Sequence, residues 1–190
     1  MWKLIKKRLQ TAVSTRPIEE VLTSQPPRIE QGRLSCEDDL LVRFNHLAAT
    51  VFGGSLHVRH VDTGSCNACE WELNALLNPV YDVSRMRIEF VASPRHADVL
   101  AVTGGVTRNL LEALRMTYEA TAWPKAVVAI GGCAIGDGLI GKTYAQEGGI
   151  APFVPIHVKV PGCPPRPQEI LAGFLHAMEC LTHGVEQSGS

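Results

Sequence analysis

Four cysteines at turn-like positions are the residues of this chain best suited to binding a metal. Cys66 and Cys69 form a Cys-x-x-Cys pair, Cys133 follows two glycines, and Cys163 stands between a glycine and a proline. Thiolate sulfur is a ligand of iron in iron–sulfur clusters and of zinc. The pattern therefore predicts a site of four thiolates if the fold brings the three turns together.

A strand-like apolar run precedes each of the three cysteine turns. These runs cover residues 56–61, 126–130 and 154–160. In an open α/β sheet, the carboxyl ends of the parallel strands meet along one edge, and ligands bind there. We therefore expect the four cysteines to surround one object at that edge.

The stretch 55–182 alternates strand-like and helix-like patterns. The run 126–130 is almost entirely apolar, as expected for a strand in the buried middle of a parallel sheet. Such alternation predicts an α/β fold, a doubly wound parallel sheet with right-handed crossovers. A long glycine-rich loop is expected over 131–149. The predicted strands are 55–61, 87–92, 98–102, 126–130 and 156–160, and the predicted helices are 70–77, 108–121 and 168–181.

Other interpretations of the cysteines remain open at this point. A zinc ribbon would carry two Cys-x-x-Cys knuckles, whereas this chain has one. A thioredoxin-like redox pair needs only Cys66 and Cys69 and leaves the other two turns unexplained. A structural module that holds a metal through four cysteines without turnover is a further alternative. Cys36 and Cys180 lack such turns, so we assign them no role.

The chain divides into an N-terminal arm (1–54), the α/β domain (55–182) and a flexible tail (183–190). A basic amphipathic helix at the start of the arm is typical of a contact with an anionic membrane surface or with a neighbouring subunit. The alternative is a frayed terminus with solvated charges. Within the arm we predict this helix, a proline-rich extended linker and a docking helix with one apolar face, at 1–13, 14–34 and 35–53.

Composition argues against several other classes of protein. The formal net charge of −1 gives no case for nucleic-acid binding. No apolar run approaches the roughly 20 residues that span a bilayer. The basic N-terminal residues lack the apolar region of a signal peptide. We therefore expect a cytoplasmic chain, in which cysteines serve as thiols or metal ligands before disulfides.

Several stretches within about residues 55–180 resemble a known family. They are the turn 66–72 and the segments 93–98, 102–109, 131–133 and 160–167. On these residues the chain resembles the small subunit of nickel–iron hydrogenases and the homologous 20-kDa-type B subunit of respiratory complex I. The resemblance implies a flavodoxin-like fold with no catalytic residue of its own. It also implies one [4Fe–4S] cluster, held by Cys66, Cys69, Cys133 and Cys163.

The spacing of the first two cysteines separates the branches of this family. Complex I subunits have two adjacent cysteines at this site, whereas two residues separate Cys66 from Cys69, which is the hydrogenase pattern. Periplasmic uptake hydrogenases add an export signal and a second cluster domain, and we expect neither here. The chain is therefore most similar to the small subunit of membrane-bound, energy-converting hydrogenases of the formate hydrogenlyase and hydrogenase-4 type.

The resemblance implies an electron-transfer subunit of a multisubunit oxidoreductase, with no turnover alone. The expected partners are a large subunit that carries nickel and iron, a ferredoxin-like iron–sulfur subunit and membrane-arm subunits. They would hold the chain peripherally on the cytoplasmic side of the inner membrane. The alternative is the N2-type cluster subunit of a complex-I-like quinone reductase, or of a hydrogenase-related oxidoreductase that reduces another substrate.

Four charged residues beside the cysteine turns are candidate contacts. Glu70 and Glu72 follow Cys69 and point in different directions on a helix. Glu72 resembles the acid that the hydrogenase branch often carries, which implies a proton route or a contact with the large subunit. The alternative is a carboxylate stabilised by the helix N terminus. Arg108 and Arg166 are suited to bidentate contacts with carboxylates of a large subunit, and the alternative is an ordinary surface position at the start of a helix.

Overall fold

The structure is a computed structural model that describes residues 29–30, 33–34, 42–48 and 54–188. The basic helix predicted for 1–13 lies outside the described residues, and so do Cys36 and most of the proline-rich linker.

Parts of the N-terminal arm are described. The short strands β1 (Ile29–Glu30) and β2 (Arg33–Leu34) pair antiparallel with each other. Residues 42–48 are helical, within the predicted docking helix. Phe44 and Ala48, two positions of the predicted apolar face, are fully buried in the core of the α/β domain.

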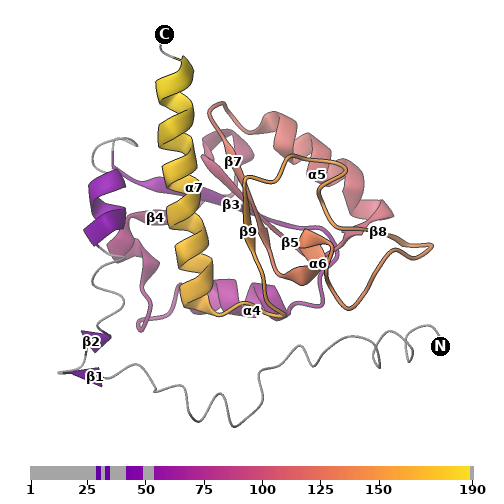
Figure 1. Ribbon diagram of the computed structural model, residues 1–190, viewed down its shortest axis with the longest axis horizontal. Helices are drawn as coiled ribbons and strands as arrows, with labels where there is room; N and C mark the ends of the chain where they lie inside the picture. Colours follow the sequence, from indigo (N-terminus) through magenta and orange to yellow (C-terminus); the bar gives the residue numbers. More distant parts are fainter. Residues whose placement is uncertain (1–28, 31–32, 35–41, 49–53, 189–190) are drawn as a thin grey trace.

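Five parallel strands form the central sheet (Figure 1). In spatial order they are β4 (Ile88–Phe90), β3 (Leu56–Asp62), β5 (Val99–Thr103), β7 (Ala126–Ile130) and β9 (Val158–Val160). Each neighbouring pair runs parallel. Numbered along the chain, the order is 2-1-3-4-5, which is the order of flavodoxin-like sheets. The predicted doubly wound α/β fold is confirmed.

The central strands β5 and β7 are apolar on both faces, and every residue of each is buried. This burial is expected where helices cover both sides of a parallel sheet. The register pairs Asp62 with Thr103, Thr103 with Ile130 and Ile130 with Val160. Four strands therefore end in line at one edge, and the cysteine turns begin there.

Helices cover both faces of this sheet. On one face, α7 (Pro167–Ser188) packs against β7 and β9, and α4 (Ala68–Ala75) contacts α7 (Figure 1). On the other face, α5 (Arg108–Ala120) buries Leu114 in a core shared with Leu100 and Val102 of β5. Side chains alternate along β5, so Val99 and Ala101 belong to the core under α7 instead.

Several predicted boundaries differ from the structure by one or two residues, and the start of β4 and the end of the last helix differ for identifiable reasons. β4 spans three residues of the predicted strand 87–92. It begins after Arg87, because this residue has a φ of 56°, which is incompatible with a strand. The predicted end of the last helix at Leu181 is wrong, since α7 continues to Ser188 and includes residues 183–188 of the predicted tail. No proline interrupts that stretch. No helix in the described part of the chain is both long and apolar enough to cross a bilayer.

The predicted loop over 131–149 contains regular structure. It includes the short helix α6 (Gly132–Ile135) and the strand β8 (Gln146–Gly148). β8 pairs antiparallel with β6 (Val106–Thr107), which follows the glycine turn after β5. This pairing ties the loop to the start of α5.

Gly173 allows α7 to approach β9 closely. A Cβ built at this glycine would lie 2.4 Å from Cγ2 of Val160. Alanine is favoured over glycine in a helix by about 1 kcal/mol, but overpacking a core costs about 1–3 kcal/mol. We therefore expect Gly173→Ala to lower the free energy of unfolding by about 1 kcal/mol, measured by urea unfolding of the full chain.

Val160→Ala removes the methyl groups that oppose this Cβ and completes a double-mutant cycle. The double variant should lose less free energy of unfolding than the sum of the losses in the two single variants, by at least about 0.5 kcal/mol. A Gly173→Ala protein that is more stable than wild type would contradict the close approach of α7 to β9.

Candidate metal centre

The four predicted cysteines line one open hollow at the carboxyl edge of the sheet, here called the cysteine hollow. Its empty volume is about 290 Å³, which includes space open to solvent. Cys180 instead packs against the hydrophobic core. The hollow is lined by Ser65, Cys66, Ala68, Cys69, Gly104, Gly132, Cys133, Gly162, Cys163 and Pro164. The structure thus brings together all four residues on which the sequence prediction depends.

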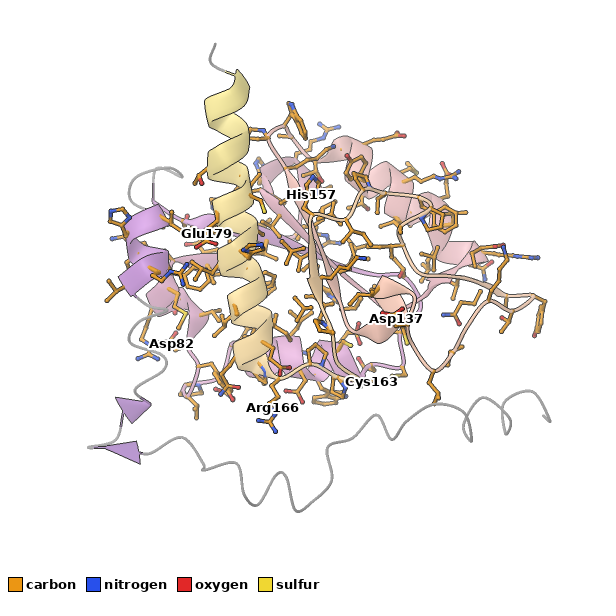
Figure 2. All side chains as sticks on the ribbon, viewed as in Figure 1. Asp82, Asp137, His157, Cys163, Arg166 and Glu179 are labelled. Atoms are coloured by element: carbon orange, nitrogen blue, oxygen red, sulfur yellow. The ribbon has the colours of Figure 1, made fainter. Side chains whose placement is uncertain are left out.

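Each cysteine turn leads into a helix whose N terminus lies at this edge. Cys69 is in the first turn of α4, Cys133 is in the first turn of α6, and Cys163 precedes the start of α7. Figure 1 shows α4, α6 and the beginning of α7 along the lower part of the domain, and Figure 2 places Cys163 and Arg166 there. The positive end of a helix dipole favours thiolate over thiol.

Glycines bring the backbone close to two of the sulfur atoms. A Cβ at Gly131 would lie 2.6 Å from Sγ of Cys69, and Gly131 also has a φ of 87°. A Cβ at Gly138 would lie 2.6 Å from Sγ of Cys133. A larger residue at either position would displace a sulfur atom, so these glycines shape the wall of the hollow.

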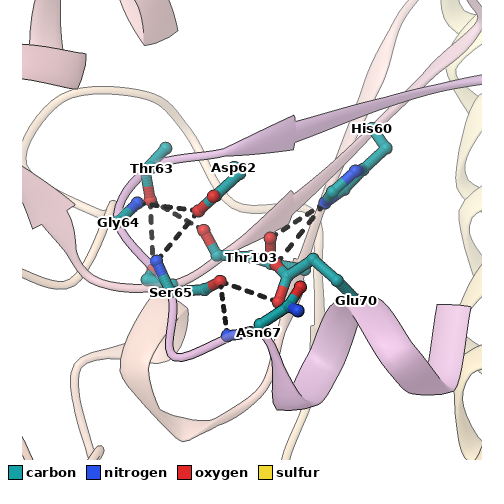
Figure 3. A network of polar contacts seen from close by, with 9 residues as sticks. His60, Asp62, Thr63, Gly64, Ser65, Asn67, Glu70 and Thr103 are labelled. Atoms are coloured by element: carbon teal, nitrogen blue, oxygen red, sulfur yellow. Dashed lines mark hydrogen bonds and ion pairs between the residues drawn. The ribbon is translucent and has the colours of Figure 1, made fainter.

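Backbone hydrogen bonds fix the turns relative to one another. The N–H of Gly132 donates to the carbonyl of Gly162 at 2.8 Å, which joins the Cys133 turn to the Cys163 turn. In the first turn, a carboxylate oxygen of Asp62 accepts from the N–H groups of Gly64 and Ser65, at 2.8 and 2.9 Å (Figure 3). These hydrogen bonds link the Cys133 turn to the Cys163 turn and order the backbone before Cys66.

The sulfur atoms influence one another electrostatically. Burial raises the pKa of the Cys69 thiol, and Glu70, Cys66, Cys133 and Cys163 raise it further, to about 12. At neutral pH, Cys69 therefore keeps its proton unless a cation replaces it. Binding of a metal at this sulfur must release that proton.

Glu70 is the acid that lies against the first cysteine turn. Only 11% of its side chain is exposed, and its Oε2 accepts a hydrogen bond from Ser65 Oγ at 2.7 Å. Its Oε1 lies 3.7 Å from Nε2 of His60, beyond hydrogen-bond distance. The same His60 nitrogen is 2.9 Å from Oγ1 of Thr103 at the end of β5 (Figure 3).

The sequence pattern does not predict this network, and the family resemblance points to Glu72 instead. Burial lowers the pKa of His60, although Glu70 and Asp62 oppose that effect. The imidazole is therefore neutral near pH 7. The signal that could have revealed the network is the pair of polar residues, His60 and Asp62, at the end of a strand that leads into the cysteine turn.

The two arginines have different surroundings. Nε of Arg108 donates to Oε1 of Glu147 at 3.0 Å, and Nζ of Lys142 lies 2.7 Å from Oε2 of the same carboxylate. Arg108 therefore has a carboxylate partner within its own chain, between α5 and β8. Arg166 is exposed beside the Cys163 turn, and its backbone N–H donates to Glu169 at 2.8 Å.

The donor set of the hollow is made of soft sulfur ligands, which suit an iron–sulfur cluster or zinc. None of the five cysteines in the described ranges forms a disulfide. Among the described residues, no three His, Cys, Asp or Glu side chains are grouped as ligands of a single metal ion.

Comparison with known proteins gives the family of the chain. Residues 66–177 match the family described as NADH ubiquinone oxidoreductase, 20 Kd subunit. A probable membrane-bound hydrogenase subunit of Pyrococcus furiosus is 46% identical over 129 residues, covering 68% of this chain and 77% of that protein. Formate hydrogenlyase subunit 7 of Escherichia coli is 38% identical over 135 residues, covering 71% of this chain and 53% of that protein.

Among solved structures, the chain is similar to a chain of the membrane-bound sulfane sulfur reductase, an archaeal respiratory membrane complex. The TM-score is 0.61 at 29% identity, and the similarity covers 77% of each chain. The resemblance to hydrogenase and complex I subunits is thus confirmed. More than half of the chain lies within the family match, including all four cysteines of the hollow, so the chain belongs to the family of the 20-kDa subunit of NADH ubiquinone oxidoreductase.

Proposed function

We propose that the chain is the electron-transfer subunit of a membrane-bound hydrogenase complex and carries one [4Fe–4S] cluster in the cysteine hollow. The observation that carries the proposal is that Cys66, Cys69, Cys133 and Cys163 line a single hollow. In this proposal each of them supplies one thiolate ligand.

The residues around the hollow fit such a cluster. A bound [4Fe–4S] cluster supplies one-electron transfer, with a potential that depends on burial, charge and hydrogen bonds to sulfur. Gly131 and Gly138 leave room beside two of the sulfurs. The positive end of α4 partly offsets the burial that raises the pKa of Cys69. The chain itself positions the ligands and performs no bond chemistry.

The names of the relatives support the assignment of partners. The Pyrococcus relative is a probable subunit of a membrane-bound hydrogenase. We infer that electrons pass from a ferredoxin-like subunit through this chain to a large subunit with nickel and iron. Membrane-arm subunits would hold this chain at the cytoplasmic side of the inner membrane.

Exposed apolar side chains beside the cysteine turns are consistent with such docking. Trp71, two residues after Cys69, is 68% exposed, and Leu139, which follows Gly138, is 53% exposed. Large apolar groups are energetically unfavourable in water and mark surfaces that a partner covers.

A second candidate function differs in the substrate of the partner. The similarity to the sulfane sulfur reductase supports a complex in which the large subunit reduces sulfane sulfur. The family description also supports a complex-I-like quinone reductase. We favour the hydrogenase, because Cys66 and Cys69 have the spaced pattern and the Pyrococcus relative is 46% identical.

Alanine substitutions test the four ligands. Alanine at Cys66, Cys69, Cys133 or Cys163 removes one bond to iron and leaves the cluster open to oxidation. We expect each variant, purified anaerobically, to retain less than about half of the wild-type iron per folded chain. Cys36→Ala and Cys180→Ala serve as matched controls and should retain all of it.

Iron loss in a control variant equal to that in the four ligand variants would contradict the assignment of ligands. So would full iron retention in any of the four.

Purification of the whole complex tests the proposed function. A complex isolated under strict anaerobiosis should contain nickel and should evolve hydrogen from a low-potential electron donor. A nickel-free complex that reduces quinone or sulfane sulfur would assign the chain to the second candidate, with the same four ligands and a different acceptor.

A further inference from the structure

Glu70 is buried in an unusual way for an acid in the first turn of a helix. Such carboxylates are usually solvated and favoured by the helix dipole. In the part of the chain that the structure describes, Oε1 of Glu70 is instead fully buried and has no hydrogen-bond partner. Burial of an incompletely paired carboxylate costs free energy, so its presence requires a reason.

The other oxygen of Glu70 holds the turn that carries Cys66. The hydroxyl of Ser65 donates to Oε2 of Glu70 at 2.7 Å and accepts from the backbone N–H of Asn67 at 3.0 Å. Cys66 lies between these two residues. The side chain of Glu70 therefore fixes the segment on either side of one proposed ligand, while its own backbone directly follows the other, Cys69.

The other carboxyl oxygen of Glu70, Oε1, faces the imidazole of His60, which is neutral. His60 lies 3.7 Å from Oε1 and is itself 2.9 Å from Thr103 Oγ1 (Figure 3). No lysine or arginine lies within 4.0 Å of Glu70 among the described ion pairs. The carboxyl group of Glu70 therefore has no lysine or arginine partner among these ion pairs, and little of it is exposed to water.

We propose that Glu70 positions the Cys66 turn and lowers the reduction potential of the cluster through its fixed negative charge. The inference rests on the proposed [4Fe–4S] cluster. Reduction adds one electron to the cluster, and a nearby carboxylate in a medium of low dielectric constant opposes that added charge. A subunit that donates electrons to a low-potential reaction benefits from such a group.

Glu70→Gln removes the charge while keeping the size and a hydrogen-bond acceptor for Ser65. At a fixed ambient potential, we expect the ratio of reduced to oxidised cluster to rise about tenfold, which is about 59 mV upward for a one-electron couple. The measurement is a redox titration of the anaerobic full chain, followed by electron paramagnetic resonance. Glu70→Asp keeps the charge and should restore most of the wild-type potential.

Ser65→Ala gives an independent test, in which the reduction potential should shift in the direction opposite to that in Glu70→Gln. It removes the hydrogen bond that partly neutralises Glu70, so the potential should fall below that of wild type. A purely structural role for Glu70 does not predict opposite shifts in the two variants. Glu112→Gln, on the exposed surface of α5, is the control for loss of one charge and should leave the potential unchanged.

The outcomes distinguish the two proposals. A wild-type chain without a reducible cluster would overturn the proposed function. A wild-type cluster with the same potential in Glu70→Gln, or a Glu112→Gln shift of equal size, would overturn the role of Glu70 alone. If Glu70→Gln fails to assemble a cluster, Ser65→Ala decides: an unchanged or raised potential in that variant overturns the inference.

Discussion

The alignment of four parallel strand ends is the constraint on which the candidate site depends. The pairs formed by Asp62 with Thr103, Thr103 with Ile130 and Ile130 with Val160 place the strand ends side by side. A shift of one residue in any pair would turn the side chains of that strand to the opposite face. The register is therefore held by the two hydrophobic cores, and the same register brings the cysteine turns together.

Close packing of the backbone then determines the shape of the cysteine hollow. Gly131 and Gly138 leave space next to sulfur atoms. The backbone hydrogen bond from Gly132 to Gly162 joins two turns that follow different strands. Within the first turn, the hydrogen bond from Ser65 to Glu70 links the residues on either side of the Cys66–Cys69 pair. The site thus lies at the carboxyl end of the sheet, where α4, α6 and α7 begin.

Much of this arrangement could be predicted from the sequence. The apolar runs before the cysteine turns predict the strands. The carboxyl ends of those strands predict where Cys66, Cys69, Cys133 and Cys163 meet. These predictions succeeded because buried parallel strands have a strong local signal. The boundary of β4 was less clear, since the left-handed conformation of Arg87 has no such signal in the sequence.

The contacts that a single sequence does not reveal are long-range and polar. The pairing of β6 with β8 joins segments far apart in the chain, and both strands are too short to show a periodic pattern. The network of His60, Thr103 and Glu70 likewise spans two strands and a helix. The family resemblance favours Glu72 over Glu70, because it does not show that Glu70 accepts a hydrogen bond from Ser65.

The most direct test of the cluster is the content of iron and acid-labile sulfide in the wild-type chain. The full chain, purified under strict anaerobiosis, should contain about four irons and about four sulfides, and should accept a single electron with the appearance of a paramagnetic signal. A chain that contains one zinc ion, no labile sulfide and no reducible centre would contradict the proposal that the cysteine hollow holds a [4Fe–4S] cluster.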